Sequence, residues 1–499
     1  MGVPEGTDEF IAIQTENILR DLGKSFDTVD KIARLDPHTG LHFLSKCLPG
    51  QIMHILRGLT PEHSQPIATF FDKRTDKSFA VILGVNENDL NVINKTVTKL
   101  ALNDGGIGLC LMSETVDAAY VAGFTASLEC IRSKYPDVSN MLLSSNINNP
   151  DIPKGVSSFI KAVGRLNVDD PSITVEGILR MKPQELKHFQ QKISKPKRDK
   201  RSVIFKKMLQ NKRDDASSRD LAMHLSCGGP DASAWVKAIG KDVNTTMSKA
   251  CFQRALKNRI LFSDPIYAEG DLCSCGTPID EKQRHFATCK KLNILAIVTH
   301  TRLQDAIQQF THVTSSKIII KEPKKWFAKS DPVTEMRLDL VFVESEGGKA
   351  VGYDVTVTHP VPANLTWNKS QLIGRAAADA EKRKILSYKD LCDVNDITFV
   401  PVAYEVGGRV GLLWRKEMER LFNMHPEGGH AGFRDYWRMR ISVALQTGIS
   451  NAMLSREALI LERKAFKASG GRLPVDASLM TDLGSYINIR GGGVGWDSS

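Results

Sequence analysis

The 499-residue chain lacks any apolar stretch near the ~18–20 residues that a membrane-spanning helix needs. Its first ten residues, MGVPEGTDEF, contain neither a basic segment nor an apolar one, so a secretory signal is not indicated. Position 6 is Gly rather than Ser or Thr, which departs from the N-myristoylation pattern. No internal repeat is found. These absences predict an intracellular protein without a membrane anchor.

Cysteine is scarce and odd in number, with nine residues of which six are scattered along the chain. An odd, irregular set argues against a disulfide framework and favours a reducing compartment. Hydrophobic residues make up 41% and charged residues 25%, which is ordinary for a globular protein. At roughly 100–200 residues per domain, this length predicts about two to four units.

The net charge of +10 is concentrated in one segment. Residues 182–213 hold twelve Lys or Arg against two acids, a surplus equal to the net charge of the whole chain. Such a run repels itself in isolation and releases counterions when it binds a phosphate backbone. We therefore expect nucleic-acid contacts here, and the alternatives are a solvated linker or a nuclear-import signal. The residues expected to make the contacts are Lys195, Lys197, Arg198, Lys200, Arg201, Lys206 and Lys207.

The pattern along the chain is helical first and mixed afterwards, so the fold class expected is multi-domain α+β. Turn-forming residues at 146–180 suit a connector between helical regions. The expected parts are a helical region (1–145), a basic helical linker (146–265), a Cys/His cluster (266–292), a mixed helix–strand region (293–425) and a helical extension with a flexible tail (426–499).

The mixed region is predicted to run in the order α-β-β-β-α-β. Apolar periodicity and β-branched runs define these elements. They are a helix at 293–311, strands at 317–322, 338–344 and 350–358, a helix at 371–391 and a strand at 397–405. The segment ESEGGK between the second and third strands suits a hairpin turn.

A zinc site is predicted in the Cys/His cluster. Four thiolate or imidazole ligands, Cys273, Cys275, His285 and Cys289, fall within 17 positions. A Cys pair on a turn, closed by a His/Cys pair one helical turn apart, matches the tetrahedral preference of zinc. Gly276 permits a left-handed turn after the Cys pair. Four ligands leave no open position, so the zinc is expected to be structural; the alternative is a set of unrelated buried thiols.

Acidic residues gather on the predicted strands. Asp339 begins one strand and Asp354 lies in the middle of the next, where a carboxylate among apolar residues is costly unless it is paired or metal-bound. Glu322, at the end of the preceding strand, could join the same edge. On the following helix, Lys384 and Tyr388 are one turn apart. Carboxylates with a nearby lysine are what magnesium-dependent phosphodiester cleavage requires, although ordinary ion pairs would also explain these residues.

The segments RLDLVFVE and GYDVTVTHP resemble the PD-(D/E)xK core of restriction-like nucleases. In their order, CSCG, RHFATC, KEP, RLD, YDVTVTHP, AEKRKILSY and FVPVAYEVGG resemble the C-terminal half of reverse-transcriptase proteins from site-specific, non-long-terminal-repeat retrotransposons. In that family a Cys/His knuckle precedes a restriction-like endonuclease. MGVPEGTDEF resembles the segment just after the polymerase palm, and the helical region that follows resembles the thumb and linker. The resemblance covers about residues 1–425.

The resemblance implies a restriction-endonuclease-like core in which Asp339 and Asp354 bind magnesium. It implies that Glu322 assists and that Lys384 positions water, with Lys382 as the second choice of lysine. Glu405 matches a recurrent acid of the family to which we assign no role.

Two positions depart from the family pattern. Leu338 replaces the Pro before the first acid, and Thr356 stands where a catalytic lysine is usual. A threonine cannot replace an ammonium group, so the lysine is expected on the next helix, at Lys384.

The function implied is that of an endonuclease that nicks double-stranded target DNA in the nucleus so that the freed 3′ end primes reverse transcription of the element RNA. No aromatic-x-Asp-Asp pair of a polymerase palm is present, so the chain is expected to be a fragment that cannot copy RNA unaided. One alternative is a non-catalytic nucleic-acid-binding relic, which Thr356 and the absent palm favour. The other is a helical scaffold that the basic run only solubilises.

Overall fold

The computed structural model describes residues 2–143, 152–212, 214–238, 240, 242–264, 271–273, 275–279, 282, 293–315, 317, 319–322, 337–343, 350–361 and 365–468. The chain divides into two compact units, Met1–Leu454 and Ser455–Ser499. The helices and the sheet belong to the first unit, apart from the end of the last helix. Within the described residues, no helix combines the length and the apolar character needed to cross a bilayer.

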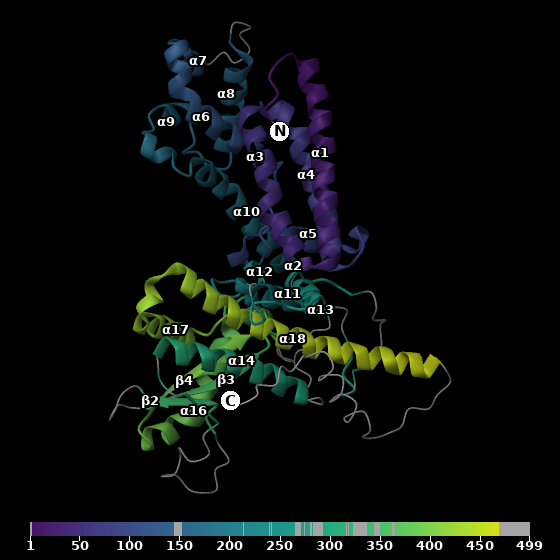
Figure 1. Ribbon diagram of the computed structural model, residues 1–499, viewed down its shortest axis with the longest axis vertical. Helices are drawn as coiled ribbons and strands as arrows, with labels where there is room; N and C mark the ends of the chain where they lie inside the picture. The colour runs from purple at the N-terminus through teal and green to yellow at the C-terminus, as the bar shows by residue number, and fades with distance from the viewer. Residues whose placement is uncertain are drawn as a thin grey trace, which may run out of the picture. The chain divides into compact units, whose positions relative to one another are not determined.

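The first region is helical, as the sequence predicted (Figure 1). It contains α1 (Asp8–Leu35), α2 (Pro37–His42), α3 (Leu48–Gly58), α4 (Pro61–Leu83), α5 (Val92–Lys99), α6 (Val116–Lys134) and α7 (Val138–Leu143). Leu22, Phe26 and Val29 recur at helical spacing on α1 and are buried where α1 packs against α4. The rings of Phe26 and Phe71 meet edge to face with centroids 5.2 Å apart, which joins these two helices.

The interpretation of residues 146–180 as a connector is wrong in its second part, because two helices form there. These are α8 (Lys154–Asn167) and α9 (Val175–Leu179). On α8, Val156, Phe159 and Val163 repeat at three- and four-residue intervals and are buried in one cluster with residues of α6 and α7. Asn and Pro just before α8 dominated the sequence pattern and obscured this short amphipathic repeat.

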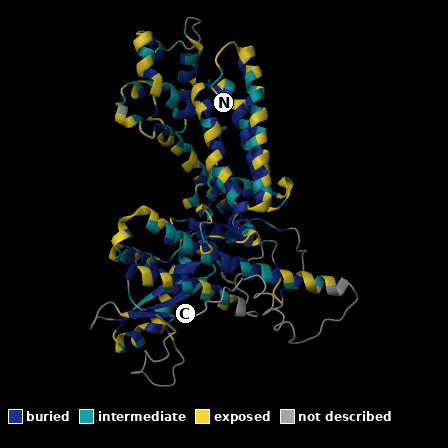
Figure 2. Ribbon diagram, viewed as in Figure 1, coloured by how far each residue is buried: buried dark blue, intermediate teal, exposed yellow. Residues whose placement is uncertain are grey.

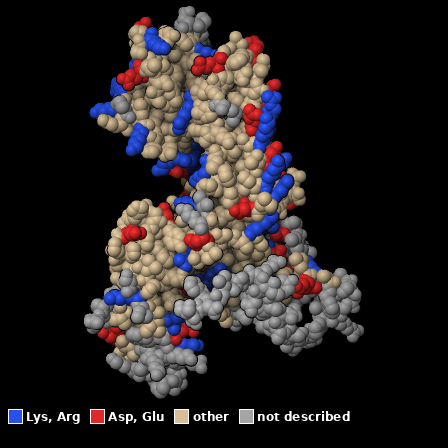
Figure 3. All heavy atoms as spheres, viewed as in Figure 1, with Lys and Arg blue, Asp and Glu red and all other residues tan. Residues whose placement is uncertain are grey.

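The basic run forms a helix that packs through an apolar face. It is α10 (Phe189–Lys212), whose buried residues include Phe189, Ile193, Phe205 and Leu209. Three helices follow, α11 (Asp215–Ser226), α12 (Ala234–Lys237) and α13 (Lys249–Arg259). Lys and Arg side chains gather over α10 on the face of the molecule in Figure 3. A self-repelling run is therefore ordered by burying its apolar face, and the solvated-linker alternative does not describe it.

Arg259, at the end of α13, joins segments that are far apart in the sequence. Its Nε donates to Gly106 O at 2.9 Å and its guanidinium nitrogens donate to the carbonyl oxygens of Leu102, Cys227 and Ala232 at 2.9–3.2 Å. The side chain is only 2% exposed. A buried guanidinium is tolerated because carbonyl acceptors replace its water.

The mixed region has the predicted order of elements, and the chain is α+β as expected. The elements are α14 (Asn293–Ser315), β1 (Ile319–Lys321), β2 (Leu340–Val343), β3 (Ala350–Thr358), α15 (Trp367–Ser370), α16 (Arg375–Val394), β4 (Ile397–Glu405), α17 (Leu412–Met424) and α18 (Ala431–Ala468). The segment expected to be the hairpin turn, 344–349, and the tail expected to be flexible, RGGGVGWDSS at 490–499, lie outside the described residues.

The four strands form one mixed sheet in the order β1-β2-β3-β4. β1, β2 and β3 are antiparallel neighbours, and β4 pairs parallel to β3 after the crossover through α16. α16 packs against β3 and β4, α14 against β1 and β3, and α17 against β4 (Figure 1). The strands are largely buried, as Figure 2 shows, because helices cover them.

Side chains alternate across β3, so its two faces have different partners. Tyr353 is fully buried and its ring lies 5.4 Å from that of Trp414 on α17. Asp354, the next residue, points to the opposite face and meets Lys384 of α16. The apolar alternation of the sheet therefore determines which helix the Asp354 carboxylate faces.

Candidate functional site

Asp339 binds the backbone on both sides of Asp354. The antiparallel pairing of β2 with β3 ends at Leu340 and Tyr353, one residue from each acid. The N–H of Asp339 donates to Tyr353 O at 3.0 Å, and its carboxylate Oδ2 accepts the N–H of Val355 at 2.5 Å. The two acids, 15 positions apart in the sequence, are therefore neighbours in the folded chain.

The Asp354 carboxylate is buried and forms an ion pair with Lys384. Its side chain is 5% exposed, and its Oδ2 lies 2.6 Å from Lys384 Nζ. Burial, followed by the charge of Asp339, raises the pKa of Asp354 above its usual value, while Lys384 and Tyr388 act in the opposite direction. Because Asp354 is buried beside the negative charge of Asp339, binding of a second cation next to these carboxylates would be favourable.

Lys384 and Tyr388 project from the same face of α16, as predicted. The ammonium of Lys384 lies 5.7 Å from the centroid of the Tyr388 ring. The Tyr388 hydroxyl donates to Arg337 O at 2.8 Å, next to the strand that carries Asp339. Lys382, the second choice of lysine, is exposed. The geometry therefore selects Lys384 from the two lysines.

Glu322 takes part through its backbone. It follows β1 with φ of +45°, and its N–H donates to Asp339 O at 3.0 Å. Its carboxylate, which is about half exposed, lies 3.9 Å from the guanidinium of Arg337. The predicted assisting role of this carboxylate stays a prediction, and the contact recorded for it is with Arg337.

Two residues of the site were missed from the sequence. His300 Nε2 lies 3.2 Å from Asp339 Oδ1, and Gln304 Nε2 donates to Asp339 O at 2.9 Å. The hydrogen bond to Asp339 raises the pKa of His300, against a smaller opposing effect of burial. Both residues interrupt the apolar periodicity of the predicted helix at 293–311, and that interruption was the available signal.

Glu405 has a structural explanation. It is buried at the end of β4, and its Oε1 accepts the N–H of Ala377 at 3.1 Å, in the first turn of α16. A carboxylate at a helix N-terminus satisfies a backbone donor that has no partner within the helix. Glu405 therefore fixes the start of the helix that carries Lys384. Thr356 lies two residues beyond Asp354 and is partly buried.

The Cys pair of the predicted zinc knuckle lies on a tight turn. The N–H of Cys273 donates to Thr277 O at 2.9 Å, and that of Gly276 donates to Cys273 O at 2.8 Å. Gly276 has φ of +83°, the left-handed conformation that the sequence predicted. His285 and Cys289 lie outside the described residues, so the four-ligand zinc site stays a prediction.

Within the ranges that the structure describes, no three His, Cys, Asp or Glu side chains form a metal-binding group. Magnesium does not require three protein ligands, since it is commonly bound through one or two carboxylates together with water and substrate phosphates. Asp339 and Asp354 provide two carboxylates beside each other, one of them buried. This donor set fits a magnesium ion that a phosphate would complete.

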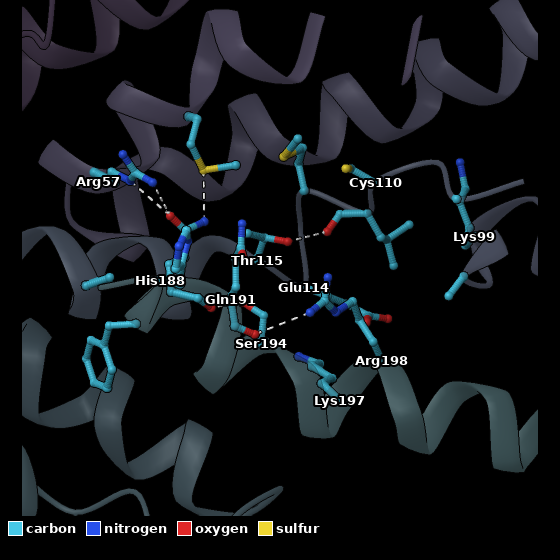
Figure 4. Close-up of a pocket in the computed structure, with 18 of the residues that line it drawn as sticks. Arg57, Lys99, Cys110, Glu114, Thr115, His188, Gln191, Ser194, Lys197 and Arg198 are labelled. Carbon is cyan, nitrogen blue, oxygen red and sulfur yellow. Dashed lines mark hydrogen bonds between the residues drawn. The ribbon is translucent and has the colours of Figure 1, made fainter. Parts of the chain in front are cut away.

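Part of the basic run lines a cleft of about 730 Å³. Lys197 and Arg198 lie on the α10 side, with Arg57 and Lys99 across from them (Figure 4). Apolar and small side chains also line the cleft, among them Met53, Leu109, Leu111, Ala122 and Ala126. Basic and apolar side chains that line one cleft can accept phosphates together with the faces of unpaired bases.

Not all of the cations in this cleft are available to a ligand. Arg201 pairs with Glu114, and Lys99 pairs with Asp76 at 2.6 Å. Arg198 donates to the carbonyl oxygen of Gln191 and has no acidic partner recorded among the described residues.

The other predicted nucleic-acid contacts divide between exposed and partly buried positions. Lys195, Lys200 and Lys207 are exposed, and Lys206 is partly buried. Lys200 pairs with Asp169 at 2.9 Å.

Compared with protein-family models and with curated proteins, the chain matches none.

Proposed function

We propose that residues 293–425 form a restriction-like endonuclease core that nicks DNA in a magnesium-dependent reaction. The observation that supports it most directly is that Asp339 binds the backbone on both sides of Asp354, while Lys384 meets the Asp354 carboxylate at 2.6 Å. Two carboxylates and an ammonium group are the side chains that hydrolysis of a phosphodiester with magnesium needs.

The arrangement of the sheet supports the same proposal. Three antiparallel strands followed by a helix and a parallel fourth strand are compatible with the αβββαβ core of that nuclease class. Asp354 lies on β3, Asp339 lies directly before the neighbouring strand β2, and the lysine lies on the crossover helix. A lysine on the next element is in keeping with Thr356 at the usual lysine position.

In this proposal Asp339 and Asp354 hold the magnesium ion, which when bound stabilises negative charge on the phosphate and lowers the pKa of a water molecule. Asp339 is kept in place by the backbone of β3, so it needs little reorganisation on binding. Lys384 is about one-third exposed, so its ammonium reaches solvent as well as Asp354 and can orient water or a phosphate oxygen there. The partly buried site limits the number of competing waters.

The remaining expectations form part of the same proposal. A structural zinc ion held by Cys273, Cys275, His285 and Cys289 would stabilise the knuckle before the nuclease region. The basic cleft and α10 would hold nucleic acid, including element RNA. The role implied by the family resemblance is nicking of a nuclear DNA target that then primes reverse transcription by a polymerase domain.

Nicking of supercoiled plasmid by the purified full chain tests the proposal. The parent protein should nick with Mg²⁺ or Mn²⁺ and not with EDTA. Asp354→Asn should lower the rate at least ~10³-fold, on the order of 4 kcal/mol of transition-state stabilisation, with DNA binding unchanged. Asp379→Asn is the matched control, because Asp379 lies on α16 and pairs only with Arg375 at 2.9 Å among the contacts recorded for it. Equal nicking by Asp354→Asn and the parent would falsify the proposed site.

A second candidate is a nucleic-acid-binding protein without nuclease activity. Thr356 and the basic cleft favour it, since the cleft needs no catalytic group. Strong, salt-dependent binding without nicking in Mg²⁺ or Mn²⁺ would support this candidate over the first.

A further inference from the structure

The inward face of α14 combines apolar residues with polar ones, and among the polar residues Gln304, Thr299, Thr311 and Thr314 are buried. Leu303, Ile307 and Phe310 are fully buried on this face. His300 and Gln304 lie one helical turn apart on it, and Gln304 has no exposed surface. Leucine or methionine would fill such positions without any polar group to satisfy, so the presence of His and Gln needs a specific reason.

Both side chains are directed at one residue. His300 meets the carboxylate of Asp339 at 3.2 Å, and Gln304 donates to the carbonyl oxygen of the same residue at 2.9 Å. Gln304 Oε1 is buried and has no hydrogen-bond partner in the described part of the chain. An unsatisfied buried polar atom lowers stability, so the contact with Asp339 is retained at the expense of stability.

With Val355, these contacts hold Asp339 at three points, two on its carboxylate and one on its backbone carbonyl. Oδ2 accepts the N–H of Val355, Oδ1 faces His300, and the carbonyl oxygen is held by Gln304. Rotation of the carboxylate about its Cβ–Cγ bond would break at least one of the two contacts that its oxygens make. The orientation of the Asp339 carboxylate is therefore set by α14 together with β3.

We propose that His300 and Gln304 are positioning residues that hold the Asp339 carboxylate in the orientation needed to share one divalent cation with Asp354. This inference rests on the proposed function for the presence of that cation. Neither residue is a metal ligand in it; they act through Asp339. Hydrogen-bonded partners of metal-ligating carboxylates typically change metal affinity by about 10–100-fold when they are removed.

Binding of Mn²⁺ to the full chain, followed by electron paramagnetic resonance, tests the inference without relying on cleavage. Mn²⁺ is used because it takes the oxygen ligands that magnesium takes. His300→Ala should weaken Mn²⁺ binding about 10–100-fold. His300→Asn keeps a side-chain N–H donor and should recover part of the loss. Gln304→Leu removes the contact to the Asp339 carbonyl while it fills the same space, and should also weaken binding.

His312→Ala is the matched control, because His312 lies on the same helix and bonds Lys317 O at 2.7 Å, away from Asp339. It should bind Mn²⁺ as the parent does. A merely structural role predicts a different outcome, in which His300→Asn and Gln304→Leu change the melting temperature and leave Mn²⁺ affinity unchanged. Thermal unfolding of each variant is measured alongside, so a loss of fold is not mistaken for a loss of positioning.

The outcomes separate this inference from the proposed function. If the parent binds Mn²⁺ and nicks DNA, and His300→Asn, His300→Ala and Gln304→Leu bind Mn²⁺ equally well, the inference alone is overturned. If Mn²⁺ binding depends on His300 and the parent nicks no DNA, the nuclease proposal alone is overturned. A parent that binds no Mn²⁺ overturns both.

Discussion

Arg259 and Asp354 are both buried charged groups, and they are satisfied in opposite ways. Arg259 is surrounded by four carbonyl oxygens from two earlier segments of the chain, which leaves little capacity for a further ligand. Asp354 has one ammonium partner and a second carboxylate beside it, so its charge is only partly balanced. A saturated buried charge holds the fold together, whereas an undersatisfied one is a candidate for binding a cation.

Substitution of Arg259 should have the largest effect on the stability of the protein. Arg259→Met should lower the free energy of unfolding by at least about 3 kcal/mol, because four buried carbonyl oxygens lose their donor. The midpoint of urea unfolding measures this loss. Arg180→Met is the control, since Arg180 forms an exposed pair with Glu176 and should change stability by about 0.5 kcal/mol or less. A loss at Arg259 no larger than at Arg180 would break the comparison.

At the Asp354 site, removal of the Lys384 ammonium group should lower the nicking rate more than it lowers the stability of the fold. Lys384→Met should lower the nicking rate about 100-fold, because a positioned charge is lost at the reacting phosphate. Lys384→Arg keeps the charge and should retain more activity. Lys382→Met, which changes an exposed lysine two residues earlier on α16, should nick at the parent rate. Equal rates for the two methionine variants would mean that Lys384 is an ordinary surface lysine.

The raised pKa of Asp354 predicts a specific pH dependence of stability. The folded protein retains the proton of this carboxyl at pH values where the unfolded chain has lost it. Its contribution to stability is therefore full below the ordinary pKa of 3.8 and is lost as pH rises through the higher folded value. Asp354→Asn has no such proton, so its stability relative to the parent should increase across that window. The unfolding midpoints of the parent and of Asp354→Asn are measured in urea from about pH 4 to pH 8. A constant difference between the two midpoints over this range would show that the pKa of Asp354 is not raised.

Lys197 and Arg198, which line the cleft, are less buried than Arg259 and Asp354. Substitution of these two residues should therefore have the smallest effects. Lys197→Ala and Arg198→Ala should each weaken binding of a single-stranded oligonucleotide several-fold and reduce the slope of log K against log salt by about one. Lys200→Ala should matter less because Asp169 already pairs with Lys200. Lys389→Ala, on the exposed side of α16, is the control. Unchanged slopes for Lys197 and Arg198 would remove the cleft from the binding surface.

The sequence by itself determined the local elements of this protein. Helical periodicity at 1–145 and the apolar, β-branched runs at 338–344 and 350–358 predicted the helices and strands correctly, because these patterns mark the residues that each element buries. The pairing of Lys384 with Tyr388 followed from helical spacing alone. Where Asn and Pro preceded a short amphipathic repeat, as before α8, turn chemistry dominated the interpretation and the helix was missed.

Only the tertiary structure decided which polar groups meet. Asp339 and His300 are 39 positions apart, and Arg259 reaches carbonyl oxygens as far away as Leu102. Such contacts depend on the register of β2 against β3 and on how α14 packs on the sheet, which no local pattern encodes. The physical reason is that a periodic sequence specifies the face that an element buries, whereas the partner on that face is set by the packing of the whole core.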